Sequence, residues 1–153
     1  MLIRLARADD APAVVVLDRQ ENPYPWGEKL IMNAFESRQG WVVQAPDSGE
    51  LVAWLCASQL YDQAELELIL VAQSVRRQGV ARQLMDAWLQ ALQAQQIAEC
   101  LLEVRETNTG AMGLYESLGF TQVGHRKNYY KTPKGREAAC LYTLSLNEIP
   151  QGD

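Results

Sequence analysis

The chain has 153 residues, of which 48% are hydrophobic and 22% are charged, and its formal net charge is -5. This length and composition are typical of one folded domain and argue against a disordered chain. The negative charge argues against a general nucleic-acid binder, which needs a broad positive surface to neutralise phosphates. We therefore expect a single domain over residues 1–153 with no nucleic-acid partner.

Membrane segments, disulfides and metal sites are not expected either. No apolar run approaches the roughly 18 residues that span a bilayer, and the N-terminal stretch MLIRLARADD lacks the apolar region and cleavage site of a signal peptide. Cys56, Cys100 and Cys140 lie in apolar, strand-like segments, which favours buried thiols in a reducing compartment. With one histidine and no C-x-x-C, a metal site lacks ligands. We expect a cytoplasmic protein with no membrane partner and no metal.

In chain order, the first half alternates apolar segments with turn residues. A helix should follow the first strand, with Asp9 or Asp10 as its cap and Pro12 in its first turn. The two prolines in Asn22-Pro23-Tyr24-Pro25-Trp26-Gly27 predict a loop. The expected elements are a strand at 2–6, a helix ending before residue 22, a helix at 28–37, and a hairpin with strands at 40–45 and 51–60.

The second half alternates strands with helices. Apolar residues at steps of four, from Val80 to Leu92, predict a long amphipathic helix. Asn108 is placed to cap a shorter helix that ends at Leu118, where Gly119 suits a left-handed residue. The expected strands are 64–71, 100–105, 120–126 and 138–146, with a loop containing Asn128, Tyr129, Tyr130 and Gly135 between the last two. The order β-α-α-β-β-β-α-β-α-β-β predicts an α/β protein with a mixed sheet and helices on both faces.

The densest positive charge lies between a strand and the long helix, at Arg76-Arg77-Gln78-Gly79. A helix N-terminus presents unpaired N–H groups and partial positive charge, which suits a phosphate. Gly79 permits close backbone approach, and Arg76, Arg77 and Arg82 can grip phosphate oxygens. Taken alone, the turn is equally compatible with a solvated surface loop. The segment matches neither G-x-x-x-x-G-K-[ST] nor G-x-G-x-x-G, so an ATP or dinucleotide site lacks its motif.

Two motifs in this context resemble those of the GCN5-related N-acetyltransferase (GNAT) superfamily. Arg76-x-x-Gly79-x-Ala81 resembles the pyrophosphate-binding signature Gln/Arg-x-x-Gly-x-Gly/Ala of that superfamily. The second motif is a strand followed by Asn, a helix and Leu-Tyr-x-x-x-Gly-Phe, matched here by Asn108, Leu114, Tyr115, Gly119 and Phe120. The resemblance implies the GNAT fold and acetyl-coenzyme A as co-substrate.

Other segments resemble one subgroup, the bacterial ribosomal-protein-alanine N-acetyltransferases, which acetylate the N-terminal alanine of small-subunit protein eighteen. These are Leu-Glu-Val-Arg at 102–105, Asn-Tyr-Tyr at 128–130, Gly-Arg-Glu-Ala at 135–138 and Tyr-Pro-Trp-Gly-Glu-Lys at 24–29. The resemblance implies that the partner is the N-terminal peptide of a ribosomal protein. The oligomeric state is open at the sequence level, and the sequence is compatible with a monomer. The alternatives are a GNAT enzyme that acetylates an internal lysine or a small amine, and a non-catalytic module that binds coenzyme A.

The resemblance also assigns roles to residues. It implies that Glu103 is the general base and Tyr115 the general acid. Without it, Glu103 reads as a solvent-facing strand residue and Tyr115 as a core aromatic. The implied cofactor residues are Ile69, Leu70 and Val71 through their backbone, the turn and helix start Arg76, Arg77, Gln78, Gly79, Val80, Ala81 and Arg82, and Asn108. The implied peptide-binding residues are Tyr24, Trp26, Tyr129 and Tyr130.

The strand before the turn departs from the subgroup pattern. Close relatives often carry Asn-Ile-Ala-Val followed by Asp-Pro, where this chain has Leu68-Ile69-Leu70-Val71 followed by Ala72-Gln73. Leu68 removes a polar side chain from the strand that should lie nearest the substrate. The peptide preference of this chain is therefore open at the sequence level.

Overall fold

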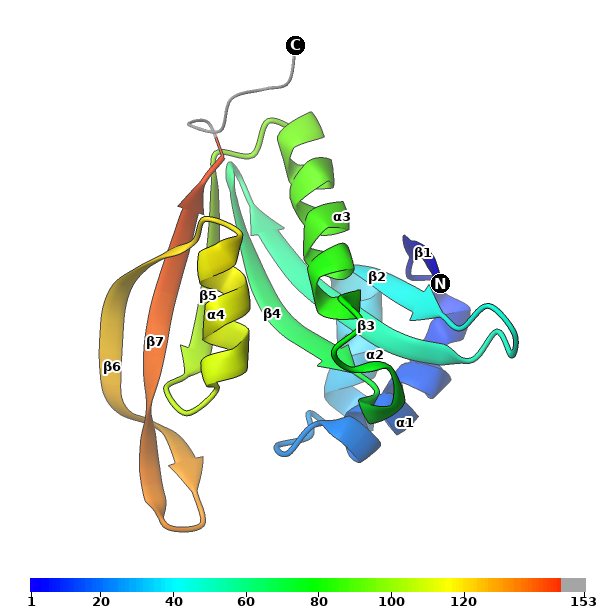
Figure 1. Ribbon diagram of the computed structural model, residues 1–153, viewed down its shortest axis with the longest axis horizontal. Helices are drawn as coiled ribbons and strands as arrows, with labels where there is room; N and C mark the ends of the chain where they lie inside the picture. Colours follow the sequence, from blue (N-terminus) through cyan, green and yellow to red (C-terminus); the bar gives the residue numbers. More distant parts are fainter. Residues whose placement is uncertain (147–153) are drawn as a thin grey trace.

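The computed structural model describes residues 1–146, so the last seven residues of the expected domain lie outside the described part. The expected order of strands and helices is confirmed, with two short 3-10 turns added (Figure 1). The elements are β1 (Leu2–Leu5), η1 (Ala8–Asp10), α1 (Ala11–Glu21), α2 (Glu28–Ser37), β2 (Gln39–Gln44), β3 (Leu51–Leu60), β4 (Gln63–Val71), η2 (Gln73–Val75), α3 (Val80–Ala94), β5 (Glu99–Arg105), α4 (Thr109–Ser117), β6 (Thr121–Thr132) and β7 (Gly135–Ser145).

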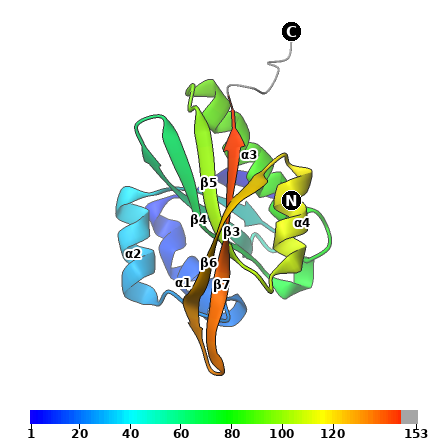
Figure 2. The ribbon, with the colours of Figure 1, turned by 90° about the vertical axis from the view of Figure 1, so that its left-hand side faces the viewer.

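The seven strands form one mixed sheet in the order β1-β2-β3-β4-β5-β7-β6, in which only β4 and β5 are parallel. Helices α1 and α2 cover one face, and α3 and α4 cover the other, as Figure 2 shows. The stripe of α3 that ends at Leu92 is fully buried against the sheet, with Trp88 at its centre. On the opposite face, Val14 of α1 and Ile31 of α2 pack around Trp54 of β3. The predicted fold class is confirmed.

The three cysteines are buried and free within this core. Burial raises the pKa of the Cys56 and Cys100 thiols to about 12, so both stay protonated at neutral pH and are unreactive. The expectation of buried, unpaired thiols is confirmed. Among residues 1–146, no helix is both long and apolar enough to cross a membrane.

The parallel pair β4–β5 separates halfway along its length. Gln63–Leu66 pair with Glu99–Leu102, but beyond these residues the two strands pair only with their other neighbours. Glu67 marks the change: Leu66 and Leu68 pair with adjacent residues of β3, so Glu67 is an extra residue in β4, a β-bulge. A bulge bends and twists its strand, and the ends of β4 and β5 diverge (Figure 1). The sheet therefore opens into a gap at its centre.

The prediction of a loop around Asn128 is wrong. β6 continues to Thr132 and β7 starts at Gly135, so the two strands form a long hairpin that extends beyond the rest of the sheet (Figure 1). Asn128 sits in an irregularity of β6 between Arg126 and Tyr130, with φ of 57°. The cluster of polar residues that predicted a loop instead lines a bulged strand whose faces are largely exposed.

The helix-end predictions have mixed outcomes. Asn108 caps α4, accepting a hydrogen bond from the Ala111 N–H at 3.3 Å, and Gly119 follows that helix with φ of 101°. Asp10 occupies the cap position of α1 but does not cap it through its side chain. Its carboxylate instead accepts two hydrogen bonds from the Arg4 guanidinium, at 2.8 and 2.9 Å, because β1 brings that arginine alongside.

Candidate active site

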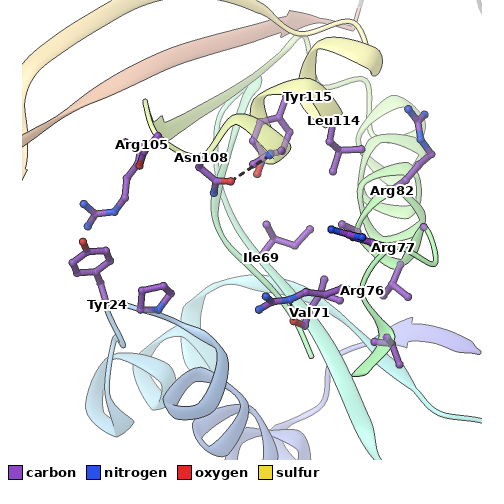
Figure 3. Close-up of a pocket in the computed structure, with 18 of the residues that line it drawn as sticks. Tyr24, Ile69, Val71, Arg76, Arg77, Arg82, Arg105, Asn108, Leu114 and Tyr115 are labelled. Carbon is purple, nitrogen blue, oxygen red and sulfur yellow. Dashed lines mark hydrogen bonds between the residues drawn. The ribbon is translucent and has the colours of Figure 1, made fainter. Parts of the chain in front are cut away.

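The gap between β4 and β5 opens into a cavity of about 870 Å³ on the α3–α4 side of the sheet (Figure 3). Its walls come from the loop between α1 and α2, the end of β4, the cationic turn, the first turn of α3, one side of α4, the end of β5 with the residues that follow it, and the start of β7. The lining residues include Ile69, Val71, Arg76, Arg77, Gly79, Val80, Ala81, Arg82, Arg105, Asn108, Leu114 and Tyr115. Most of the residues expected to bind the cofactor therefore meet around one cavity.

The cationic turn has the backbone shape of an anion site. Gly79 is the N-cap of α3, with φ of 77°, and Arg77 is also left-handed, with φ of 65°. The first hydrogen bond of α3 runs from Gln83 N to Gly79 O at 3.0 Å, so the N–H groups that precede Gln83 in the helix lack intrahelical acceptors. Successive N–H groups in such a turn form a concave cradle for phosphate or carboxylate.

The arginines of this turn are held differently. Arg76 pairs with Glu21 of α1 at 2.9 Å, and its Nε donates to the Val71 carbonyl at 3.2 Å. Arg82 donates to the hydroxyl of Ser117, which ties α3 to α4 at the rim of the cavity. The charge of Arg76 is thus already paired with a carboxylate within the cavity wall. Arg77 and Arg82 are better placed for a bound anion, because the hydroxyl that Arg82 contacts is neutral.

The residues of β4 alternate in the direction of their backbone N–H and C=O groups, which point either toward β3 or toward the gap. Ala72 N donates to Val52 O at 2.8 Å, on the β3 side. Alternate residues of a strand direct their backbone groups to the same edge, so Leu70 also faces β3, whereas Ile69 and Val71 face the gap. The Leu70 side chain is buried on the α1–α2 face and does not line the cavity. Gln78 is exposed and does not line it either.

Tyr115 of α4 is 4% exposed, and its ring packs at 6.0 Å from that of Phe120. It nevertheless lines the large cavity as well as a second one, so the core-aromatic reading and the cavity reading both hold. Burial raises the pKa of Tyr115 to about 12, which keeps its hydroxyl protonated at neutral pH. Asn108 likewise caps its helix and lines both cavities.

The second cavity, of about 230 Å³, lies on the α1–α2 side of the gap. The two cavities adjoin at the gap, since they share five lining residues: Tyr24, Ile69, Arg105, Asn108 and Tyr115. Its remaining walls include Trp26, Leu68, Glu103 and Tyr130. Sequence reasoning placed Glu103 and Tyr115 in one site, and in the fold both residues line this second cavity.

Charge differs between the two cavities. The large cavity carries four arginines and one glutamate, whereas Glu103 and Glu67 line the small one with Arg105. Glu103 is 25% exposed in its side chain and lies 3.4 Å from Arg126 of β6. Burial, followed by the neighbouring carboxylates of Glu103 and Glu67, raises the pKa of Glu65. The large cavity therefore has an excess of arginines in its walls, whereas the small one has two carboxylates, of which Glu67 pairs with Arg38 at 2.9 Å and Glu103 with Arg126.

The four expected peptide-binding aromatics do not share one place. Tyr24, Trp26 and Tyr130 line the small cavity, and Trp26 also packs edge-on against Trp54 at 6.0 Å, which makes it a loop anchor as well. Tyr129 is 45% exposed and lines neither cavity; its ring contacts that of Tyr130 at 5.1 Å. The structure therefore places three of the four aromatics around the small cavity, and a role of Tyr129 in peptide binding stays a prediction.

Sequence reasoning missed the residues at the far end of the gap. Arg105, Thr107 and Glu137 line the large cavity. The signal for Arg105 was present, since it stands two residues after Glu103 and therefore on the same face of β5. Glu137 belongs to the Gly-Arg-Glu-Ala segment, to which no role was assigned, and it reaches the site because β7 pairs Leu141 with Glu103 and Ala139 with Arg105.

Comparison with known proteins gives consistent results. The model of the acetyltransferase (GNAT) family matches residues 7–120. A ribosomal protein bS18-alanine N-acetyltransferase of Escherichia coli K12 is 35% identical over 141 residues, covering 90% of this chain and 93% of the relative. One of Haemophilus ducreyi is 35% identical over 123 residues, covering 80% and 84%. The crystal structure of the ribosomal-protein-S18-alanine N-acetyltransferase from Escherichia coli superposes with a TM-score of 0.86 at 30% identity, covering 99% of both chains.

Proposed function

The chain belongs to the GNAT family of acetyltransferases, and from that premise we propose that it transfers the acetyl group of acetyl-coenzyme A to the N-terminal alanine amine of a small-subunit ribosomal protein. The observation that carries the proposal is the pair of adjoining cavities at the gap between β4 and β5, one with four arginines in its walls and the other with Glu103. A cofactor that is anionic and an amine that is cationic before reaction would approach each other from the two sides. The relatives named for this activity support the choice of substrate.

The large cavity fits acetyl-coenzyme A in size and chemistry. A volume of about 870 Å³ is within the range of sites that hold cofactors. The cradle around Gly79, with Arg77 and Arg82, would hold the pyrophosphate. The backbone groups of Ile69 and Val71 that face the gap would pair with the amides of the pantetheine arm. One of their N–H groups would polarise the thioester carbonyl, as an oxyanion donor.

Glu103 and Tyr115 would move the two protons of the reaction. Attack by the amine forms the C–N bond and breaks the C–S bond, so the amine loses a proton and the sulfur gains one. Glu103, on the amine side, accepts the first directly or through water. Tyr115, which faces both cavities and enters the reaction protonated, donates the second to the sulfur.

The α-amine is the nucleophile that this arrangement suits best. Its pKa of roughly 7.7–8.0 leaves on the order of a tenth neutral at pH 7, whereas a lysine amine has a pKa near 10.4. A single carboxylate is enough to assist an amine that is already partly neutral. An internal lysine or a small amine is the alternative acceptor, and a non-catalytic coenzyme A module is the alternative outside enzymes.

One experiment separates these functions. The purified protein is incubated with acetyl-coenzyme A and a peptide that copies the alanine-starting N-terminus of ribosomal protein S18, and with the same peptide blocked at its α-amine. Mass spectrometry should find acetylation of the free peptide alone. Equal modification of both peptides would assign the acetyl group to a lysine. Modification of neither, with acetyl-coenzyme A binding intact, would refute the peptide substrate and leave the small-amine enzyme and the module that only binds.

A further inference from the structure

Three segments far apart in the chain meet at one arginine. The guanidinium carbon of Arg105, at the end of β5, lies 3.6 Å from the ring centroid of Tyr24 and 4.1 Å from that of Tyr130. Tyr24 belongs to the loop between α1 and α2, and Tyr130 to the extended part of β6. Guanidinium groups at these distances are attracted to the faces of aromatic rings. Arg105 therefore holds an N-terminal loop and a C-terminal hairpin against the end of β5.

Arg105 is itself held in place by an ion pair with Glu137 of β7. Its Nη1 lies 3.4 Å from Glu137 of β7, and the Glu137 carboxylate also accepts hydrogen bonds from the backbone N–H and the hydroxyl of Thr107. The side chains of Arg105 and Glu137 are only 22% and 11% exposed. An ion pair that is largely shielded from water holds its geometry better than a surface pair does.

The position of this cluster suggests what it does. Tyr24 and Arg105 line both cavities, and Tyr130 lines the smaller one beside Glu103. Figure 3 shows Arg105 and Tyr24 facing each other at the edge of the large cavity, across from Ile69 and Arg76. The gap between β4 and β5 would be open at this end, because the strands diverge there. The contact of Arg105 with Tyr24 bridges that opening.

We propose that Arg105 is a positioning residue for the acceptor peptide: by stacking on Tyr24 and Tyr130, it closes the open end of the gap and forms the wall against which the amine is placed beside Glu103. This inference rests on the proposed function and specifies how that site orders its substrate. Arg105 acts through the two rings and takes no part in proton transfer. The ring faces are used in the contact, and the phenol hydroxyls are not needed for it.

The proposal predicts a particular kinetic signature. Arg105→Met keeps an unbranched side chain but removes the cation, so the two rings lose their common anchor. The KM for the peptide should rise on the order of tenfold, since the bound peptide loses a wall. The kcat should change by less than about threefold, because Glu103 and Tyr115 are untouched, and the KM for acetyl-coenzyme A should rise less than the peptide KM, because the cationic turn is intact. A variant that was only less stable would lose kcat with both KM values unchanged.

Matched variants isolate the ring contact. Arg136→Met makes the same substitution on an exposed arginine of the same hairpin that lines neither cavity, and it should leave the peptide KM unchanged. Tyr24→Phe keeps the ring and should leave the peptide KM within about twofold, whereas Tyr24→Leu should raise it, by no more than Arg105→Met does, since the contact of Arg105 with Tyr130 remains. The double variant of Tyr24→Leu and Arg105→Met should be no worse than Arg105→Met alone, because Arg105→Met already removes the contact with Tyr24. A large loss in Tyr24→Phe, or additive losses in the double variant, would overturn the proposal.

Amide hydrogen exchange tests the same contact without using activity. In Arg105→Met, exchange should speed up in residues 22–27 and 126–132 together, and in Arg136→Met the 22–27 loop should keep its wild-type rate. Unchanged exchange of the loop in Arg105→Met would refute the bridging role even if the enzyme is active. Failure of the wild-type protein to acetylate the peptide would instead refute the proposed function, and the exchange result would still decide whether Arg105 holds the two segments.

Discussion

Asp18 of α1 offers a test of how the peptide side of the site is built. Asp18 is only 1% exposed, although aspartate is a polar residue that is rarely fully buried without hydrogen-bond partners. It accepts hydrogen bonds from Asn22 Nδ2 at 2.9 Å, from Trp26 N at 3.2 Å and from Gly27 N at 3.1 Å. These donors all belong to the loop that carries Tyr24. Asp18 therefore fixes that loop onto the helix that precedes it.

The cost of Asp18→Asn follows from these contacts. The amide oxygen of asparagine can still accept from Asn22 and Trp26, which both bond to Oδ1 of the aspartate. Its NH2 group then faces the Gly27 N–H, so one hydrogen bond to a charged acceptor is lost and two donors meet. Loss of such a bond costs about 2–3 kcal/mol. For a chain of this length, that lowers the Tm by about 4–12 °C.

Thermal unfolding followed by circular dichroism measures this loss, with Asp86→Asn on the exposed side of α3 as the matched control. The peptide KM should rise in Asp18→Asn, because the loop positions Tyr24 and Trp26, and the acetyl-coenzyme A KM should not. A Tm within about 2 °C of the control, a smaller shift than even 1 kcal/mol would produce, would show that Asp18 does not hold the loop. A lowered Tm with an unchanged peptide KM would show that the loop does not shape the peptide site.

Four further predictions concern the chemistry and the stability of the fold. Tyr115→Phe should slow acetylation by about 10²- to 10⁴-fold while acetyl-coenzyme A affinity, measured by calorimetry, stays within a few-fold; a full-rate variant would remove the acid role. Glu103→Gln should reduce turnover most at low pH, where less amine is neutral, and a flat, negligible loss across the pH–rate profile would contradict a base at this position. Gly113→Ala should stabilise the protein by about 0.5–1 kcal/mol in urea unfolding, because the site is helical and open space surrounds the added methyl group. Arg4 lowers the pKa of Asp10 from its usual 3.8, so the ion pair contributes stability above that value and loses it as pH falls through the lower folded value; Asp10→Asn should destabilise at pH 7, and a gap to wild type that does not narrow in acid would refute the linkage.

Local signals were enough to predict the succession of strands and helices. The α3 stripe, the cap at Asn108 and the left-handed Gly119 depend on a few neighbouring residues, and all three are confirmed. Gly79 was singled out for close backbone approach, and its φ of 77° supplies a second reason for a glycine there. Such features can be predicted from the spacing or type of a few residues, since a helix repeats every 3.6 residues and has preferred residue types at its ends.

The late hairpin shows where local signals fail. Residues 127–137 contain a Pro, a Gly and several polar side chains, which favour a loop. The pairing of Tyr130 with Glu137 and of Lys131 with Arg136 extends both strands regardless. Strand propensity depends on the partner strand and on the faces it covers, so it is less visible in one segment than helix periodicity is.

The sequence by itself determined the family, the order of elements and the set of residues with suitable chemistry, because motifs and periodicity are properties of short segments. The tertiary structure decided which of those residues share a space. The bulge at Glu67 opens the sheet, and Arg76 pairs with Glu21, which is 55 residues away in the chain. Arg105 contacts the rings of Tyr24 and Tyr130, which come from the N-terminal and C-terminal parts of the chain. Each of these depends on the register and divergence of strands that are distant in sequence. No periodicity within a single segment records such a contact, and so the shape of the acceptor site emerged only from the folded chain.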